Sequence, residues 1–251
     1  MFESLINFFY IILYQPLFNS LVVLYNYTGH DFGIAIIFLT LVIRFILYPV
    51  SVKAVTSQRS LQRLQPQIQE IQKKYKNDKE KQAKETLALY KNEKINPFSG
   101  LLLALIQLPI LIALYKVFWS GLNPEELSAL YGFVSNPSQI NPLFLHIIDL
   151  SKPNLILAIL AGLSQYFQTK SLTPKTTRQT NGQKGTADFS KAMQKQMLYV
   201  LPVFTVVILI NLPSALGLYW TISGLFSIIQ QYFIFKKHGK PEIINKPTTQ
   251  Q

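Results

Sequence analysis

Long apolar stretches separated by strongly basic polar segments are the feature of this sequence that most limits its fold. Of its 251 residues, 49% are hydrophobic and 14% are charged, yet the formal net charge is +12. An average globular protein has about 25% charged residues. A chain this apolar and this basic must keep its charge in separate segments, which is typical of an all-α polytopic membrane protein.

Five stretches are predicted to be transmembrane spans, because a helix needs about 20 residues to cross the hydrocarbon core. They run from Phe32 to Val52, Pro97 to Trp119, Pro153 to Thr169, Leu198 to Leu212, and Ala215 to Phe235. The fourth is only ~22 Å long against a core of ~30 Å, so we expect local thinning of the bilayer beside it.

The basic residues predict the orientation of these spans. All but three of the 24 Lys and Arg lie between spans one and two, between spans three and four, or after span five; the exceptions are Arg44, Lys116 and Lys152. The positive-inside rule therefore places these segments in the cytoplasm, with the N-terminus outside and the C-terminus inside. Because no signal or transit peptide is recognisable, we expect a bacterial cell (inner) membrane.

The segment 1–30 is predicted to be extracytoplasmic. Residues Met1 to Tyr27 are apolar but interrupted by Asn7, Pro16 and Asn19, which favours an amphipathic helix in the outer interface followed by a short piece broken at the proline. The alternative is a sixth span, although no Lys or Arg precedes Arg44 to hold the N-terminus inside.

Two polar segments face the cytoplasm in this topology. After the first span (31–52), residues 53–96 contain apolar residues at heptad spacing, interrupted by a turn signal. This pattern predicts a helical hairpin with basic outer faces. The hairpin either contacts anionic lipid or a partner, or is simply a solvated surface. Within the region 97–235 that holds spans two to five, residues 171–190 are predicted to be a disordered loop, and 236–251 a basic tail.

Several kinds of chemistry are not indicated. The chain has no Cys and three isolated His, so we expect no metal or other cofactor. No Gly-rich phosphate loop is present, and no specific nucleic-acid site is expected.

Arg44 is a charged residue inside the otherwise apolar first span. An Arg inside a span usually faces a bundle interior or a water-filled cavity, unless its side chain snorkels to the interface. Thr40 lies one turn earlier on the same face, and Gln107 and Gln165 in other spans could share a hydrated cavity with it. Each Gln could equally hold two helices together. No Asp or Glu lies in any span to pair with Arg44.

The sequence resembles the YidC-type membrane protein insertase family, which includes mitochondrial oxidase-assembly and chloroplast Albino relatives. The resemblance rests on three motifs in the family's order: TLVIRFILYP at 40–49, the Asn96-Pro97 pair followed by QLPILIALY at 107–115, and LPSALGLYWTISG at 212–224 ending in Gln230-Gln231. It implies a five-span core and a hydrophilic groove open to the cytoplasm and lipid. In that groove Arg44 would be the central arginine and Thr40 its neighbour, with Gln165 and Trp220 as further lining residues.

We therefore expect an insertase and chaperone that places small membrane proteins into the bilayer without ATP, and not an enzyme. Its substrates would be nascent membrane proteins, with the general secretion channel and the ribosome as further candidate partners. A small solute transporter and a membrane-complex assembly factor are the alternatives. The spans show neither the internal repeat of a transporter nor the acid–base or nucleophile groups of a membrane-embedded enzyme.

Overall fold

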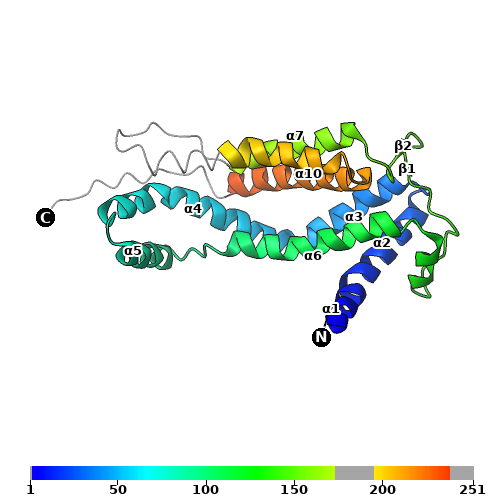
Figure 1. Ribbon diagram of the computed structural model, residues 1–251, viewed down its shortest axis with the longest axis horizontal. Coiled ribbons are helices and arrows are strands. Elements are labelled where there is room, and N and C mark those ends of the chain that lie inside the picture. Colours follow the sequence, from blue (N-terminus) through cyan, green and yellow to red (C-terminus); the bar gives the residue numbers. More distant parts are fainter. Residues whose placement is uncertain (1, 173–194, 238–251) are drawn as a thin grey trace. The chain divides into compact units, whose positions relative to one another are not determined.

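The computed structural model describes residues 2–172 and 195–237, and these are mainly helical, as expected for the predicted class (Figure 1). The chain divides into two compact units. One comprises Met1–Tyr48 and Leu105–Ile229, and the other Pro49–Ala104 and Gln230–Gln251. The predicted loop at 171–190 lies outside the described residues except for its first two, which belong to a helix. Most of the predicted tail, from residue 238 onward, also lies outside them.

The first unit begins with a helix that continues through a proline. Helix α1 (Phe2–Phe9) passes through a π-helical turn, η1 (Tyr10–Tyr14), into α2 (Gln15–Tyr27). The break predicted at Pro16 is wrong. Pro16 lies in the first turn of α2, where its missing N–H is tolerated, and the wider π-turn precedes it.

Helix α3 (Phe32–Ile46) starts at a strong cap and ends earlier than predicted. The Asp31 side chain accepts a hydrogen bond from the Ile34 amide at 2.9 Å, which satisfies one of the free N–H groups of the first turn. The predicted first span is interrupted at Leu47, and α4 (Tyr48–Lys74) follows as a separate helix. Pro49 favours the break, because it has no N–H to donate to the Phe45 carbonyl and its ring clashes with that carbonyl in a continuous helix.

Four further helical segments correspond to the other predicted spans: α6 (Ser99–Ser120), α7 (Leu155–Leu172), the π-turn η3 (Gln196–Val200) leading into the short α9 (Leu201–Leu209), and α10 (Ser214–Lys237). In the first unit, α7 lies beside both α9 and α10 (Figure 1). A Cβ on Gly224 would lie 2.5 Å from the Ser164 hydroxyl oxygen. The absence of a side chain there allows α7 and α10 to approach closely, as small residues do between membrane helices.

Residues 121–152, here called the 121–152 loop, form a tightly bonded connection between α6 and α7. It contains the 3₁₀ turn η2 (Pro124–Ala129) and two short antiparallel strands, β1 (Leu143–Phe144) and β2 (Ile148–Asp149), paired Leu143 to Asp149 and Phe144 to Ile148.

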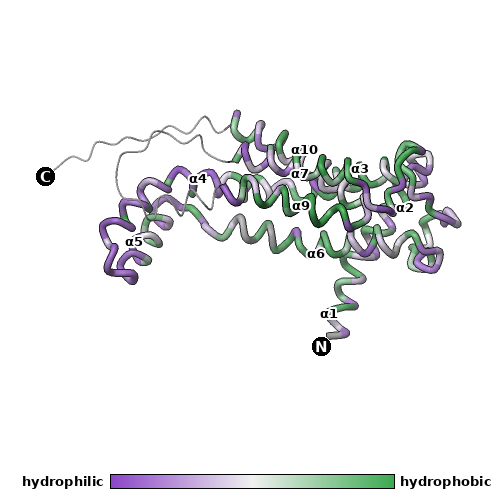
Figure 2. Tube along the Cα trace, turned by 45° about the horizontal axis from the view of Figure 1, so that its top comes forward, coloured by the Kyte–Doolittle hydropathy of each residue, from purple (hydrophilic) through white to green (hydrophobic). Residues whose placement is uncertain are grey.

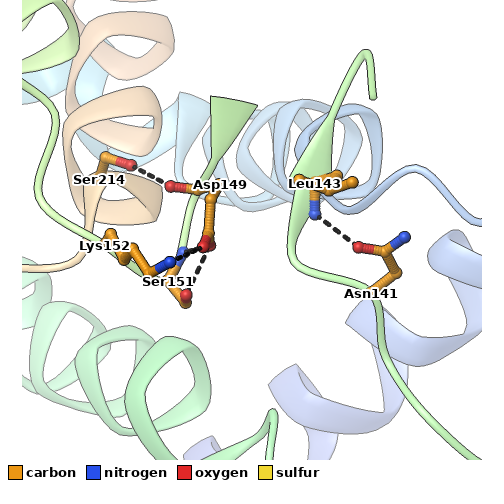
Figure 3. A network of polar contacts seen from close by, with 6 residues as sticks. All are labelled: Asn141, Leu143, Asp149, Ser151, Lys152 and Ser214. Carbon is orange, nitrogen blue, oxygen red and sulfur yellow. Dashed lines mark hydrogen bonds and ion pairs between the residues drawn. The ribbon is translucent and has the colours of Figure 1, made fainter. Parts of the chain in front are cut away.

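Asp149 organises the end of this loop next to α10 (Figure 3). Its carboxylate accepts hydrogen bonds from the Ser151 amide at 3.0 Å and the Ser151 hydroxyl at 2.5 Å, and it pairs with Lys152 at 3.1 Å. Burial acts to raise the pKa of Asp149, but the bonds from Ser151 and Lys152 outweigh it and hold this pKa below its ordinary value. The Ser214 hydroxyl donates to the Asp149 carbonyl, so the loop is fastened to the first residue of α10.

The second unit is dominated by polar helices. Figure 2 shows mostly hydrophilic residues along α5 (Lys79–Asn92) and much of α4. Asp78 caps α5 by accepting from the Lys81 amide at 2.9 Å, and Leu64 and Ile68 of α4 are buried. Ser51 donates to Gln230 at 2.8 Å, and the Arg59 guanidinium lies 4.4 Å from the centre of the Phe235 ring, which ties the start of α4 to the end of α10.

Among the described helices, Ile6–Tyr27 alone is long and apolar enough to cross a membrane by itself. Helices α3 and α4 meet the same criterion only as one broken span, and Leu105–Trp119 and Gln196–Leu209 are shorter apolar helices. The five-span count therefore stays a prediction.

Candidate functional site

Arg44 lies in the last turn of α3 with its side chain partly buried. Its Nε atom is buried and has no hydrogen-bond partner among the described residues. Thr40, one turn earlier, is fully buried, and its hydroxyl donates to the Ile36 carbonyl at 2.6 Å. The Thr40 donor is thus already used within its own helix, whereas Arg44 keeps an unused donor inside the protein.

Tyr219 of α10 holds one of the predicted residues. Gln107 of α6 donates from Nε2 to the Tyr219 hydroxyl oxygen at 2.6 Å, and the Tyr219 ring is almost completely buried. Gln107 therefore joins α6 to α10 through a side chain that was not among the predicted site residues.

A second polar group lies where α7 and α10 make their close contact. Gln165 of α7 is 9% exposed and Ser223 of α10 is 3% exposed. They are the sequence neighbours of Ser164 and Gly224, which form one of the close contacts between these helices. The Gln165 Oε1 and the Ser223 Oγ are both buried without a hydrogen-bond partner among the described residues.

Trp220 lies next to Tyr219 but on a different face of α10. It is partly exposed and packs against the edge of the apolar core. The structure therefore pairs Gln107 with Tyr219, leaves the Arg44 Nε buried without a partner among the described residues, places Gln165 beside the α7–α10 contact, and leaves Trp220 on the rim of the core.

Tyr219 and Ser223 are the residues that sequence reasoning missed. They are four positions apart, so they share one face of α10, and Ser227 continues that face another turn along. This polar row inside an otherwise apolar span was a signal available in the sequence.

Two hollows in the surface of the described residues contain none of the five predicted residues. One is an apolar cleft between α7 and the η3–α9 segment, and the other lies between the N-terminal helix and the residues Lys116 and Glu126. The described residues also contain no group of three or more His, Cys, Asp or Glu side chains able to hold a metal ion.

Comparison with known proteins identifies the family. The family model described as 60Kd inner membrane protein matches residues 23–241. A protein of Fusobacterium nucleatum named "Membrane protein insertase YidC" is 37% identical over 212 residues, which cover 84% of this chain and 89% of that protein.

Two longer relatives carry the same name. The protein of Syntrophus aciditrophicus is 37% identical over 90% of this chain, and that of Geobacter sulfurreducens is 33% identical over 92% of it. This chain spans only 36% and 39% of their respective lengths. With its three motifs and these matches, the chain belongs to the 60Kd inner membrane protein family, the YidC-type insertases that its motifs resemble.

Proposed function

We propose that this protein is a membrane protein insertase that transfers short polar segments of nascent membrane proteins across the bilayer without ATP. Family membership and the name shared by its relatives support this function. The reaction makes and breaks no covalent bond, so it needs no enzymatic site. Burial of about 20 apolar substrate residues in lipid supplies the driving force.

The observation that carries the mechanism is a set of three unpaired polar atoms inside the first unit. The Arg44 Nε, the Gln165 Oε1 and the Ser223 Oγ come from α3, α7 and α10, and each is buried without a partner among the described residues. Buried polar groups are normally hydrogen-bonded, and leaving one unpaired costs about 1–3 kcal/mol. Water, or the polar segment of a substrate, would supply the missing partners.

Arg44 determines which substrates benefit most. Placing an Arg inside a span costs about 2.5–3.5 kcal/mol on insertion scales, so it calls for an anionic or hydrogen-bonding partner. An acidic substrate tail would form charge-assisted hydrogen bonds with the guanidinium, which are the strong kind. The apolar part of the substrate would slide along exposed side chains of α7 and α10, such as Leu163, Phe167 and Leu225.

Protease protection in proteoliposomes tests this mechanism. The substrate is a single-span protein with a short acidic outer tail, and the measured quantity is the fraction of tails protected. Arg44→Ala should lower the rate of protection about tenfold, since one charge-assisted bond is lost. Arg44→Lys should retain part of the activity, and Lys116→Ala, which removes an exposed Lys from α6, should have no effect.

Equal protection with the parent chain and Arg44→Ala would remove Arg44 from the mechanism while leaving the insertase. No protection with a folded parent chain would favour an assembly factor or a transporter instead.

The basic α4–α5 region is proposed to recruit substrates, the ribosome or the secretion channel at the cytoplasmic surface. Its support is the excess of Lys and Arg along both helices. In the same assay, deletion of 54–94 should slow protection of a substrate delivered from solution. Unchanged insertion by the deletion variant would refute this role.

The N-terminal helix is proposed to lie in the outer interface. The Tyr14 hydroxyl donates to Glu126 at 2.7 Å, and the Asn26 amide donates to the Ser135 carbonyl at 2.7 Å. These two anchors are about 18 Å apart along the helix, yet both bind the 121–152 loop. A crossing helix would carry the Glu126 carboxylate deep into the hydrocarbon, which is strongly unfavourable.

Labelling single cysteines tests this placement, and the chain is suited to it because it has no Cys. A membrane-impermeant maleimide should label Glu3→Cys in intact cells and Lys84→Cys only after lysis. Protection of Glu3→Cys in intact cells would establish the sixth-span alternative.

A further inference from the structure

The apolar cleft between α7 and the η3–α9 segment is bounded where the two helices meet. Its volume is about 230 Å³, and its floor lies at Gly162, where a Cβ would meet the Val206 side chain and lie 3.1 Å from the Pro202 carbonyl oxygen. Side chains on its walls are substantially exposed, with Leu163 at 48% and Val203 at 62%. The cleft is thus an open apolar channel on the helix surface rather than an internal void.

One end of this cleft is marked by two tyrosines. Tyr166 of α7 and Tyr199 of η3 both line it, with their ring centres 5.9 Å apart. Tyrosine is enriched at the level of lipid head groups, since its ring is apolar and its hydroxyl is polar. The tyrosine pair therefore indicates where the cleft reaches the membrane–water interface.

Two lysines lie just beyond the tyrosines at the same end. Lys170, one turn after Tyr166, has its ammonium group 5.4 Å from the centre of the Tyr166 ring. Lys195 comes one turn before Tyr199, and both lysines are exposed. An apolar channel thus ends at two aromatic rings and then at two positive charges.

We propose that this cleft binds one anionic phospholipid, with an acyl chain along Gly162 and Val203 and the head-group phosphate between Lys170 and Lys195. The apolar cleft matches the acyl chain, the two tyrosines match the level of the head group, and the two lysines match the phosphate. A transmembrane helix of a protein substrate fits less well, because a helix is about 10 Å wide. This site is separate from the residues around Arg44, and the proposal does not depend on insertase activity.

Photolabelling in vesicles tests the site. The full-length protein is reconstituted in phosphatidylcholine vesicles containing a trace of phosphatidylglycerol with a diazirine on its acyl chain. After irradiation, labelled peptides are identified by mass spectrometry. Label should concentrate on peptides covering 155–172 and 195–209, and excess unlabelled phosphatidylglycerol should displace it.

The lysines and the cleft can be probed by separate variants. Lys170→Gln and Lys195→Gln should each lower the apparent affinity for phosphatidylglycerol about fivefold, given the usual contribution of a lysine near an anionic surface. Lys236→Gln, which removes an exposed lysine from α10, is the charge control and should not change it.

Val203→Trp should block the channel and abolish labelling of these peptides by phosphatidylglycerol and phosphatidylcholine probes alike. Val207→Trp is its matched control, because Val207 is also an exposed valine of α9 but does not line the cleft.

Three outcomes would overturn the proposal. The first is label spread evenly over all lipid-facing helices. The second is equal labelling by anionic and zwitterionic probes that does not change in the lysine variants. The third is labelling that persists in Val203→Trp. Displacement of the label by a substrate helix but not by excess phosphatidylglycerol would identify the cleft as a protein-binding site instead.

Discussion

The 121–152 loop and the helix interior of the first unit differ in whether their polar groups have hydrogen-bond partners. Side chains of α2 are bonded to backbone groups of the loop, which are far away in sequence. Asn19 accepts from the Tyr131 amide at 2.7 Å and donates to the Ala129 carbonyl at 3.2 Å, and Tyr25 accepts from the Asn141 amide at 2.9 Å. In the helix interior of the same unit, one polar atom each of α3, α7 and α10 (Arg44 Nε, Gln165 Oε1 and Ser223 Oγ) is buried without a partner among the described residues.

This difference separates a structural role from a functional one. The bonds from α2 hold the loop in place, because each of them fixes a backbone group of the loop. Unpaired groups lower stability and persist where a ligand or water completes them. The comparison predicts that substitutions in the loop reduce stability, whereas substitutions around Arg44 reduce insertion.

The largest effect on stability is expected from Asp31→Ala. One Asp31 oxygen caps α3, and the other accepts from the Leu145 amide at 2.6 Å, where Leu145 has a φ of 52°. Loss of the cap and of this bond should lower the free energy of unfolding by about 2–4 kcal/mol. Thermal unfolding in detergent measures this change.

Asn154→Ala is the matched control for Asp31→Ala. The Asn154 side chain caps α7 by accepting from the Ile156 and Leu157 amides, but no bond from it to the loop is present among the described contacts. Its loss should cost only about 1 kcal/mol. Equal effects of the two variants would mean that the bond to Leu145 adds nothing.

A smaller loss of stability is expected when acidic pH protonates Asp149. Because its pKa is lower in the folded protein than in the unfolded chain, its stabilising contribution is complete above about pH 4 and is lost as the pH falls through the folded value. Hydrogen exchange of peptides covering 141–152 should therefore accelerate at acidic pH relative to the intrinsic rate. Asp149→Asn should exchange faster at neutral pH and lose this dependence, and an unchanged acid response in the variant would assign it to another group.

The smallest effect on stability is expected from Ser223→Ala. The Ser223 hydroxyl is buried and unpaired, so its removal should leave the free energy of unfolding unchanged or raise it slightly. Insertion of an acidic-tailed substrate should nevertheless slow. A clear loss of stability would show that Ser223 is bonded in the folded protein and would weaken the contrast with the loop.

Sequence reasoning located α6, α7 and α10 to within a few residues, because apolar runs flanked by Pro, Asn or Ser mark helix ends. It failed at Leu47 and Pro16, where one proline ends a helix and the other does not. Both prolines lie in the first turn of the next helix and follow a helical segment, but a π-turn precedes Pro16 and the helix continues, whereas the helix is interrupted at Leu47 before Pro49. Hydropathy alone does not record that difference.

The candidate site was predicted in part for a similar reason. An Arg in an apolar span is conspicuous in a sequence, so Arg44 could be selected directly. The contact between Gln107 and Tyr219 joins residues 112 positions apart, and the bond from Ser214 to Asp149 joins residues 65 apart. Such pairings follow from helix packing, which no local pattern encodes.

The two π-turns have a consequence for how this chain tolerates changes in length. Each contains a bond that spans five residues instead of four, from the Gln15 amide to Tyr10 and from the Leu201 amide to Gln196, just before a proline. The wider turn absorbs its surplus residue, so the side chains beyond it face as they would in a regular helix that is one residue shorter. Deleting a single residue there would give a regular α-helix and leave the direction of the following side chains unchanged. Elsewhere in α2 or α9 the same deletion would rotate all following side chains by about 100° around the helix axis, so these two turns are the positions where the chain can lose one residue and keep its packing.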